Sequence, residues 1–276
     1  MDPGLLRPDW PAPPSVGAAV STRRGGVSVA PWDSLNLGGH VGDDPAAVAE
    51  NRRRLTAALG LGREPVWLEQ VHGTRVLTLD ASEPVDRVAD GALTRTPGVA
   101  CAVMTADCLP VLFCDRAGTA VAASHAGWRG LAAGVLRATV EAMGVPPGDI
   151  LAWLGPAIGP ARFEVGEEVR AAMVDNAVDA RHRAAIPSCF VLSPASPGKL
   201  LADIYGLARA ELGAAGVGAT FGGGLCTVTD SANWYSYRRD GVTGRMAALV
   251  WLEEVGPVTP EVRSLTLDAG RWTLDA

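Results

Sequence analysis

The 276-residue sequence is poor in several residue types, and each shortage excludes a class of protein. Lys199 is the sole lysine among 24 basic residues, aromatic residues make up 5% of the chain, and there are four histidines. No run of eighteen apolar residues occurs and the first residues lack a signal-peptide pattern, so we expect neither a membrane protein nor an exported one. A net charge of −6 argues against a dedicated nucleic-acid-binding protein.

The five cysteines bear on the cellular compartment of the protein, and the 23 arginines bear on the ligands that it binds. An odd number of cysteines without paired spacings predicts reduced thiols, and therefore a cytoplasmic protein. A genome rich in arginine codons accounts for most of the arginines. Some of them nevertheless lie in motifs that suit bidentate binding of phosphate or carboxylate.

The order of the expected elements predicts an α+β fold. Asp44, Pro45 and Gly60 are the start and stop signals of a helix over residues 44–60. We expect strands at residues 66–68, 75–79, 99–105, 111–113, 119–124, 150–154 and 246–252. Further helices are expected at 131–143, 165–175 and 200–212. Irregular alternation of this kind favours helix-covered sheets over a regular βαβ winding.

Three residues that can bind a metal each follow or end a strand pattern. They are His72, Cys108 and His125, and a turn-forming Gly, Pro or Ala-Gly comes directly after each or one residue further on. Two imidazoles and a thiolate match a catalytic zinc whose fourth position stays open. The spacing is unlike that of zinc fingers, and packing in a β-rich interior is the competing interpretation.

A second set of residues is polar. Asp107 precedes Cys108, and Arg129 lies at an expected helix start, where it either holds phosphate or pairs with Asp107. Asn36, His40, Asn51, Arg52 and Gln70 lie in turn-rich segments. Residues 235–245 combine three arginines with two tyrosines, which is typical of a structural loop or an anion-binding lip.

Nine motifs stand in a fixed order between about residue 16 and residue 253. They are Thr22-Arg-Arg-Gly-Gly-Val-Ser, Asn36-Leu-Gly-Gly-His-Val-Gly-Asp-Asp-Pro, Glu50-Asn-Arg, Gln70-Val-His-Gly, Ala89-Asp-Gly, Thr105-Ala-Asp-Cys-Leu-Pro-Val, His125-Ala-Gly-Trp-Arg-Gly, Leu154-Gly-Pro-Ala-Ile-Gly and Ser236-Tyr-Arg-Arg-Asp-Gly-Val-Thr-Gly-Arg. In these motifs the sequence resembles the YfiH family, also called laccase-domain or polyphenol oxidase proteins. The departures are the Cys226-Thr-Val-Thr segment, where relatives carry an aromatic residue, and the additional Arg24.

The resemblance implies a fold and a domain plan. The fold would be a single CNF/YfiH-like domain with helices flanking two stacked mixed sheets in α/β/β/α layers. That domain would span residues 16–253, after an N-terminal extension at 1–15 and before a tail at 254–276 with a short strand near 264–267.

The resemblance also implies an activity and a set of ligands. It implies a purine nucleoside phosphorylase acting on adenosine, inosine and methylthioadenosine, with adenosine deaminase activity, and zinc on His72, Cys108 and His125. A zinc ion that activates water would account for deamination, with Asp107 as proton shuttle and His125 as a further catalytic residue. Phosphate needs cationic partners, for which we expect Arg52 and Arg129, with Asn36 and Gln70 as further substrate-binding residues.

Three alternatives compete with this interpretation. The first is a metal-free hydrolase or deamidase with Cys108 as nucleophile and His125 as its base. The second is a copper-dependent polyphenol oxidase, which four histidines can hardly support. The third is a non-catalytic module that recognises peptidoglycan precursors or a cell-division partner. The sequence carries no signal for an oligomeric state.

Overall fold

Two stacked β-sheets form the centre of the molecule. The computed structural model describes residues 4–82 and 84–254. The five-stranded sheet has the order β1 (Leu5–Leu6), β2 (Val16–Ser21), β14 (Met246–Leu252), β6 (Ala100–Thr105), β3 (Val66–Trp67). The six-stranded sheet has the order β13 (Ala219–Gly222), β9 (Ile150–Leu154), β7 (Leu109–Asp115), β8 (Val121–Ala126), β5 (Gly91–Thr94), β4 (Val76–Leu79). Both sheets are mixed, because β3 runs parallel to β6 and β13 parallel to β9 whereas most other neighbours are antiparallel.

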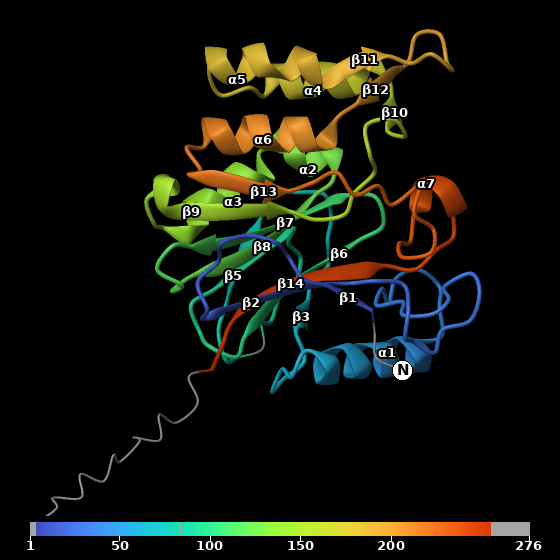
Figure 1. Ribbon diagram of the computed structural model, residues 1–276, viewed down its shortest axis with the longest axis vertical. Coiled ribbons are helices and arrows are strands. Elements are labelled where there is room, and N and C mark those ends of the chain that lie inside the picture. Colours follow the sequence, from blue (N-terminus) through green and yellow to red (C-terminus); the bar gives the residue numbers. More distant parts are fainter. Residues whose placement is uncertain (1–3, 83, 255–276) are drawn as a thin grey trace, which may run out of the picture.

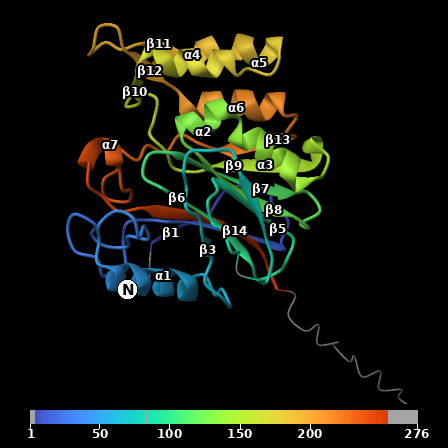
Figure 2. The same cartoon turned by 180° about the vertical axis from the view of Figure 1, so that it is seen from behind.

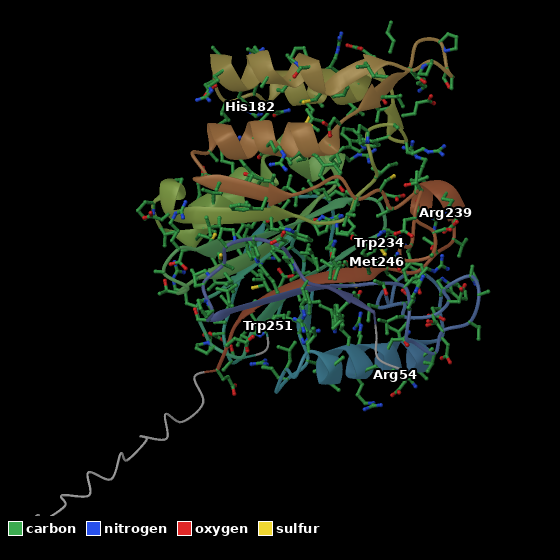
Figure 3. All side chains as sticks on the ribbon, viewed as in Figure 1. Arg54, His182, Trp234, Arg239, Met246 and Trp251 are labelled. Atoms are coloured by element: carbon green, nitrogen blue, oxygen red, sulfur yellow. The ribbon has the colours of Figure 1, made fainter. Side chains whose placement is uncertain are left out.

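Apolar runs occupy both faces of the central strands, as buried sheets require. In β14, Met246, Ala248 and Val250 point between the two sheets. The alternate residues Ala247, Leu249 and Trp251 pack on the outer side of the five-stranded sheet. Figure 3 shows the side chains filling the layers, with Met246 and Trp251 towards opposite ends of β14.

Helices cover the outer face of each sheet. Leu55 and Leu59, at the end of α1 (Pro45–Ala58), pack on the five-stranded sheet. The six-stranded sheet is covered by α2 (Trp128–Ala133), α3 (Val135–Met143) and α6 (Ile204–Ala214). The resulting α/β/β/α layers are visible from bottom to top in Figure 1 and from behind in Figure 2.

A smaller set of elements extends the helical layer. A three-stranded sheet with the order β10 (Glu164–Val165), β12 (Leu200–Ala202), β11 (Phe190–Leu192) lies next to α4 (Glu167–Asp175) and α5 (Ala180–Ala185). Two 3₁₀ turns, η1 (Pro147–Asp149) and η2 (Ile186–Cys189), and the short α7 (Tyr237–Asp240) complete the described elements.

The expected α+β layers are confirmed, and two expected helices need correction. The helix expected at 131–143 is split into α2 and α3, because Gly134 adopts a left-handed conformation with φ of 97°. The helix expected at 200–212 begins only at Ile204. Its first residues form β12, since Asp203 caps α6 by accepting a hydrogen bond from the amide of Tyr205 at 3.0 Å.

The chain ends add two observations. Within the predicted extension 1–15, β1 pairs with β2, and Leu6, Trp10 and Ala12 pack against the core between the sheets. The strand predicted near residues 264–267 lies outside the described residues. The domain boundaries themselves stay predictions.

Candidate metal centre and cavity

Cys108 lies where the chain crosses from one sheet to the other. Strand β6 of the five-stranded sheet ends at Thr105, and β7 of the six-stranded sheet begins at Leu109. The three connecting residues make a sharp turn in which Asp107 has φ of 93°, a conformation that non-glycine residues rarely adopt. The turn places the Cys108 thiol at one edge of both sheets.

Strand pairing brings His125 beside this thiol. β7 and β8 are antiparallel, with Leu109 opposite Ala126 and Pro110 opposite His125, so the start of one strand meets the end of the other. His125 is buried, with 4% of its surface exposed. Its Nδ1 lies 2.8 Å from Oδ1 of Asp90, which leaves Nε2 for the site.

Asp90 also holds the loop that carries His72. Its carboxylate oxygens accept hydrogen bonds from the backbone amides of Val71 at 3.1 Å, His72 at 2.9 Å and Gly73 at 2.6 Å. His72 itself has φ of 61°. A single carboxylate therefore fixes one imidazole directly and the other through its backbone.

The three side chains form a compact group of donors. The ligand atoms of His72, Cys108 and His125 all lie within 4.8 Å of one another. Sγ of Cys108 is 3.8 Å from Nε2 of His72, near the separation of roughly 3.6 Å that a sulfur and a nitrogen have in a tetrahedral zinc site. A Cβ on Gly127 would lie 2.6 Å from Cδ2 of His72 and 3.0 Å from Sγ of Cys108, so glycine leaves room for the group.

The charges of the group support metal binding. Burial alone would raise the pKa of Cys108, but the neighbouring His125 and His72 lower it to about 6. Burial alone would lower the pKa of His125, but the Cys108 thiolate and Asp90 raise it to about 9. Ionised sulfur is the form that binds metals, and a cation that binds here would displace the proton from His125.

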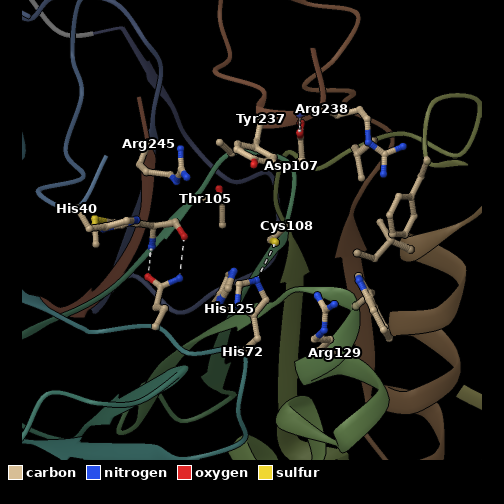
Figure 4. Close-up of a pocket in the computed structure, with 17 residues that line it drawn as sticks. His40, His72, Thr105, Asp107, Cys108, His125, Arg129, Tyr237, Arg238 and Arg245 are labelled. Carbon is tan, nitrogen blue, oxygen red and sulfur yellow. Dashed lines mark hydrogen bonds between the residues drawn. The ribbon is translucent and has the colours of Figure 1, made fainter. Parts of the chain in front are cut away.

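A cavity of about 540 Å³ opens over this group, a size typical of small-molecule sites. Figure 4 shows its lining. Besides the three donors, the lining consists of His40, Gln70, Met104, Thr105, Ala106, Asp107, Trp128, Arg129, Ile158, Phe163, Ile204, Tyr237, Arg238 and Arg245.

Of the four residues predicted to bind substrate or phosphate, the structure places two in the cavity lining. Arg129 is exposed and its guanidinium stacks on Trp128 at 4.4 Å from the ring centroid. Gln70 exchanges two hydrogen bonds with the backbone of Met104, at 2.8 and 2.7 Å, which fixes its amide against the end of β6.

Asn36 and Arg52 lie outside the cavity lining. Asn36 is buried and its Oδ1 accepts from the amides of Gly38 and Arg245, both at 2.9 Å. Arg52 donates twice to the carbonyl of Leu37, at 3.0 and 2.8 Å, and stacks on Trp67. Both side chains therefore brace residues 36–40.

Asp107 lines the cavity with its carboxylate already engaged. The oxygens accept from Oγ1 of Thr227 at 2.5 Å, Oγ of Ser236 at 3.0 Å and the amide of Arg238 at 2.7 Å. These contacts tie the sheet crossover to the start of α7, and none of them involves Arg129. They favour a positioning role, and the proton-shuttle role stays a prediction.

Sequence reasoning missed two features of the site. Asp90 was part of the Ala89-Asp-Gly motif, but a carboxylate just before a strand gives no pattern that marks a metal partner. His40 was noted without a role and Arg245 as part of a structural loop or an anion-binding lip, and the structure brings both into the cavity lining. In the part of the chain that the structure describes, no helix is both long and apolar enough to cross a membrane.

Comparisons with known proteins show the family of the chain. A family model described as multi-copper polyphenol oxidoreductase laccase matches residues 17–253. The chain is 61% identical over 249 residues to a purine nucleoside phosphorylase of Pseudomonas aeruginosa, covering 90% of this chain and 98% of that protein. It is 57% identical over 248 residues to the purine nucleoside phosphorylase YfiH of Escherichia coli, with coverage of 90% and 98%.

Solved structures share the fold. A Neisseria meningitidis protein matches with a TM-score of 0.83 and 51% identity, covering 91% of this chain and 99% of that one. YlmD from Geobacillus stearothermophilus matches with a TM-score of 0.82 and 33% identity, covering 92% and 98%. The chain therefore belongs to the family of YfiH and its relatives, which the matching model describes as multi-copper polyphenol oxidoreductase laccase.

Proposed function

We propose that the protein is a zinc-dependent purine nucleoside phosphorylase that cleaves adenosine, inosine and methylthioadenosine with phosphate and also deaminates adenosine. The observation that carries the proposal is the His72, Cys108 and His125 group at the wall of a nucleoside-sized cavity. Relatives named purine nucleoside phosphorylases support the reaction class.

Zinc suits the donors that the chain offers. Two imidazoles and one thiolate, with Asp90 hydrogen-bonded to one imidazole, resemble catalytic zinc sites with an open position. When bound, zinc would supply a Lewis acid and lower the pKa of a coordinated water towards 7. Among the described residues this is the single cluster of three or more such donors, whereas a multicopper centre needs several sets of ligands.

Phosphorolysis requires the protein to bind an anion beside a nucleoside. A phosphate oxygen bonds to C1′ of the ribose as the C1′–N9 bond breaks, and the electron pair of that bond leaves with the purine. The apolar side chains of Trp128, Phe163 and Ile158 offer a wall for the base, and the arginines of the cavity, Arg129 among them, offer charges for phosphate.

Deamination uses the same cavity with water in place of phosphate. Water adds to C6 of adenine and ammonia leaves, which yields inosine. Asp107 lines the cavity next to Cys108, and we propose that it orients the polar groups around the reacting base or passes a proton to it. His125, held by Asp90, is the second residue proposed to assist proton transfer.

Product analysis of adenosine, with and without phosphate, tests the proposal. We expect adenine and ribose 1-phosphate to form when phosphate is present, and inosine to form without it. Cys108→Ala and His72→Ala are expected to abolish both reactions. Full activity of folded, zinc-free variants in both assays would rule the metal mechanism out.

One observation favours a second candidate, the thiol hydrolase. Cys108 lies 3.8 Å from Nε2 of His72 and close to His125, the type of contact that activates a nucleophilic cysteine. This candidate predicts that protein stripped of metal keeps its activity and loses it on alkylation with iodoacetamide. The phosphorylase proposal predicts that stripping removes activity and that added zinc restores it.

A further inference from the structure

The cavity has two unlike sides, with the donor group between them. On one side lie Arg129 and Arg238, and on the other lie His40 and Arg245 (Figure 4). The guanidinium of Arg129 stacks on Trp128 and that of Arg238 lies over Phe163, so the first side also carries the apolar rings. The difference in chemistry between the two sides raises the question of which one binds the anion.

Arg245 is a half-buried cation without a carboxylate partner. Its Nη1 donates to the carbonyls of Thr243 at 3.1 Å and Gly244 at 3.0 Å. Among the described residues, its Nε and Nη2 make no hydrogen bond and its guanidinium makes no ion pair. Burial lowers the pKa of Arg245, and the charges of Cys108 and Asp107 oppose this without forming an ion pair with the guanidinium, which has therefore lost part of its hydration.

His40 adds a second donor on the same side. Burial, together with the nearby Arg245 and Arg52, lowers the pKa of this imidazole. The guanidinium of Arg245 and the imidazole of His40 thus line one part of the cavity, and the single carboxylate among the described residues of the lining, Asp107, is already hydrogen-bonded. An oxyanion bound there would favour the charged form of His40 and satisfy the free donors of Arg245.

Hydrogen bonds fix the loop that packs beside Arg245. Asn36 fixes the amides of Gly38 and Arg245, and Arg52 holds the carbonyl of Leu37, whose amide donates to the carbonyl of Arg245 at 3.1 Å. A Cβ on Gly38 would lie 2.8 Å from Cγ of Arg245, so the loop packs directly on the arginine stem. Such preorganisation lowers the entropic cost of binding a small ligand.

The other arginines of the cavity are less suited to the task. Arg129 is exposed and held only by its stacking on Trp128. Arg238 donates from Nη1 to the carbonyl of Glu164 at 3.0 Å, and Glu164 also provides a nearby negative charge that would repel an anion. Both are on the side that offers apolar contacts.

We propose that Arg245 and His40 form the binding subsite for inorganic phosphate, across the donor group from an apolar wall that takes the purine. Asn36 and Arg52 then act as positioning residues for this subsite. The inference rests on the proposed phosphorylase function and specifies which side of the cavity binds each substrate. The metal-binding group would lie between the two substrates, beside the bond that phosphate attacks.

Steady-state kinetics of inosine phosphorolysis, with the zinc content of each protein measured, test the assignment. Arg245→Gln is expected to raise the KM for phosphate roughly tenfold or more while the KM for inosine changes less than about twofold, because only the charge-assisted bonds to phosphate are lost. Arg245→Lys keeps a positive charge but loses the planar, two-donor geometry of the guanidinium. Its KM for phosphate should therefore lie between those of the wild type and Arg245→Gln. Phe163→Ala should show the opposite pattern, with a raised KM for inosine.

Arg129→Gln is the competing variant. A rise in the phosphate KM for Arg129→Gln, with none for Arg245→Gln, would overturn the proposal. Calorimetric titration with inorganic phosphate, and separately with adenosine 5′-monophosphate, separates this inference from the proposed function. If Arg245→Gln no longer binds inorganic phosphate, the subsite is supported even if the wild type fails to phosphorolyse inosine. If Arg245→Gln loses only the binding of adenosine 5′-monophosphate, the subsite is contradicted.

Discussion

At the scale of single residues, Asp90 determines whether the donor group holds together. Its carboxylate contacts the His125 imidazole and three amides of the His72 loop, so two of the three donors depend on one buried side chain. Burial alone would raise the pKa of Asp90, but hydrogen bonds from His125 and Gly73 lower it, which keeps the carboxylate charged. The anionic form both orients the imidazole and strengthens it as a ligand.

Asp90→Asn should therefore weaken zinc binding. We expect about a 10- to 100-fold loss of affinity, because the amide keeps the shape of the carboxylate but loses its charge and one acceptor. Competition with a chromophoric chelator measures the effect. Asp115→Asn is the matched control, since Asp115 caps the Thr119 turn at the opposite end of β7. Equal zinc affinity for both variants would contradict the role of Asp90.

Gly127 offers a second test at this scale. The backbone of Gly127, with φ of −63°, suits alanine, but the added Cβ would overlap His72 and crowd Cys108. Gly127→Ala should therefore reduce zinc affinity, by about tenfold or more, with little change in the free energy of unfolding of the metal-free protein. Gly213→Ala in α6 is the control, because its Cβ meets nothing within 4 Å. Unchanged zinc affinity in Gly127→Ala would show that the three donors lie further apart than described.

At the scale of elements, α6 packs a carboxyl group into the helical layer. Glu211 is 3% exposed, and its Oε1 accepts a hydrogen bond from the Arg137 amide of α3 at 3.3 Å. Burial raises the pKa of Glu211 to about 7, against an ordinary value near 4.5, and the contact with Arg137 only partly opposes this. The carboxyl is thus neutral in the folded protein over a range in which the unfolded chain ionises.

The consequence is a stability that falls as pH rises. Below about pH 4.5 both states hold the proton, and between about 4.5 and 7 the unfolded state loses it first, so the free energy of unfolding decreases through this window. Glu211→Gln should remove on the order of 2–3 kcal/mol of that decrease. Denaturant unfolding of both proteins at pH 5 and pH 8 measures it, with the exposed Glu141→Gln as control. A constant difference between wild type and Glu211→Gln across this range would contradict the account.

Local sequence signals located most of these elements but not their breaks. Asp44 and Pro45 marked the start of α1, where the Asp44 side chain accepts from the amide of Ala46. Gly134 divides α2 from α3, yet a lone glycine in a helical pattern is often tolerated, so the sequence did not reveal the break. Residues 200–202 join a sheet through Phe190 and Glu164, which are distant partners that periodicity cannot detect.

At the scale of the whole molecule, the site forms where the chain passes from the five-stranded sheet to the six-stranded sheet. The donor types could be predicted from the sequence, and Cys108 and His125 lie at strand ends as expected, whereas His72 lies in the loop between β3 and β4. The three donors come together because β7 pairs with β8 and because Asp90 bonds to His125, and both are tertiary contacts that local sequence patterns do not reveal. For the same reason the sequence could not show that Asn36 and Arg52, the latter in α1, hold the loop beside Arg245, and their predicted contact with substrate stays a prediction.

The layered architecture also explains why the cavity is polar on one side. Residues 36–40 and Arg245 come from the five-stranded sheet and its loops, whereas Trp128 and Phe163 come from the helical layer over the six-stranded sheet. A nucleoside has an apolar base and phosphorolysis adds an anion, so a cavity between unlike layers suits this pair of substrates.

The most direct test of the central claim is phosphate-dependent release of hypoxanthine from inosine, measured by chromatography as zinc is titrated into metal-free protein. The account predicts that activity rises in proportion to bound zinc, reaches its limit at one zinc per chain, and is absent from folded Cys108→Ala at every zinc concentration. Activity that is independent of zinc, or that persists in Cys108→Ala, would contradict it.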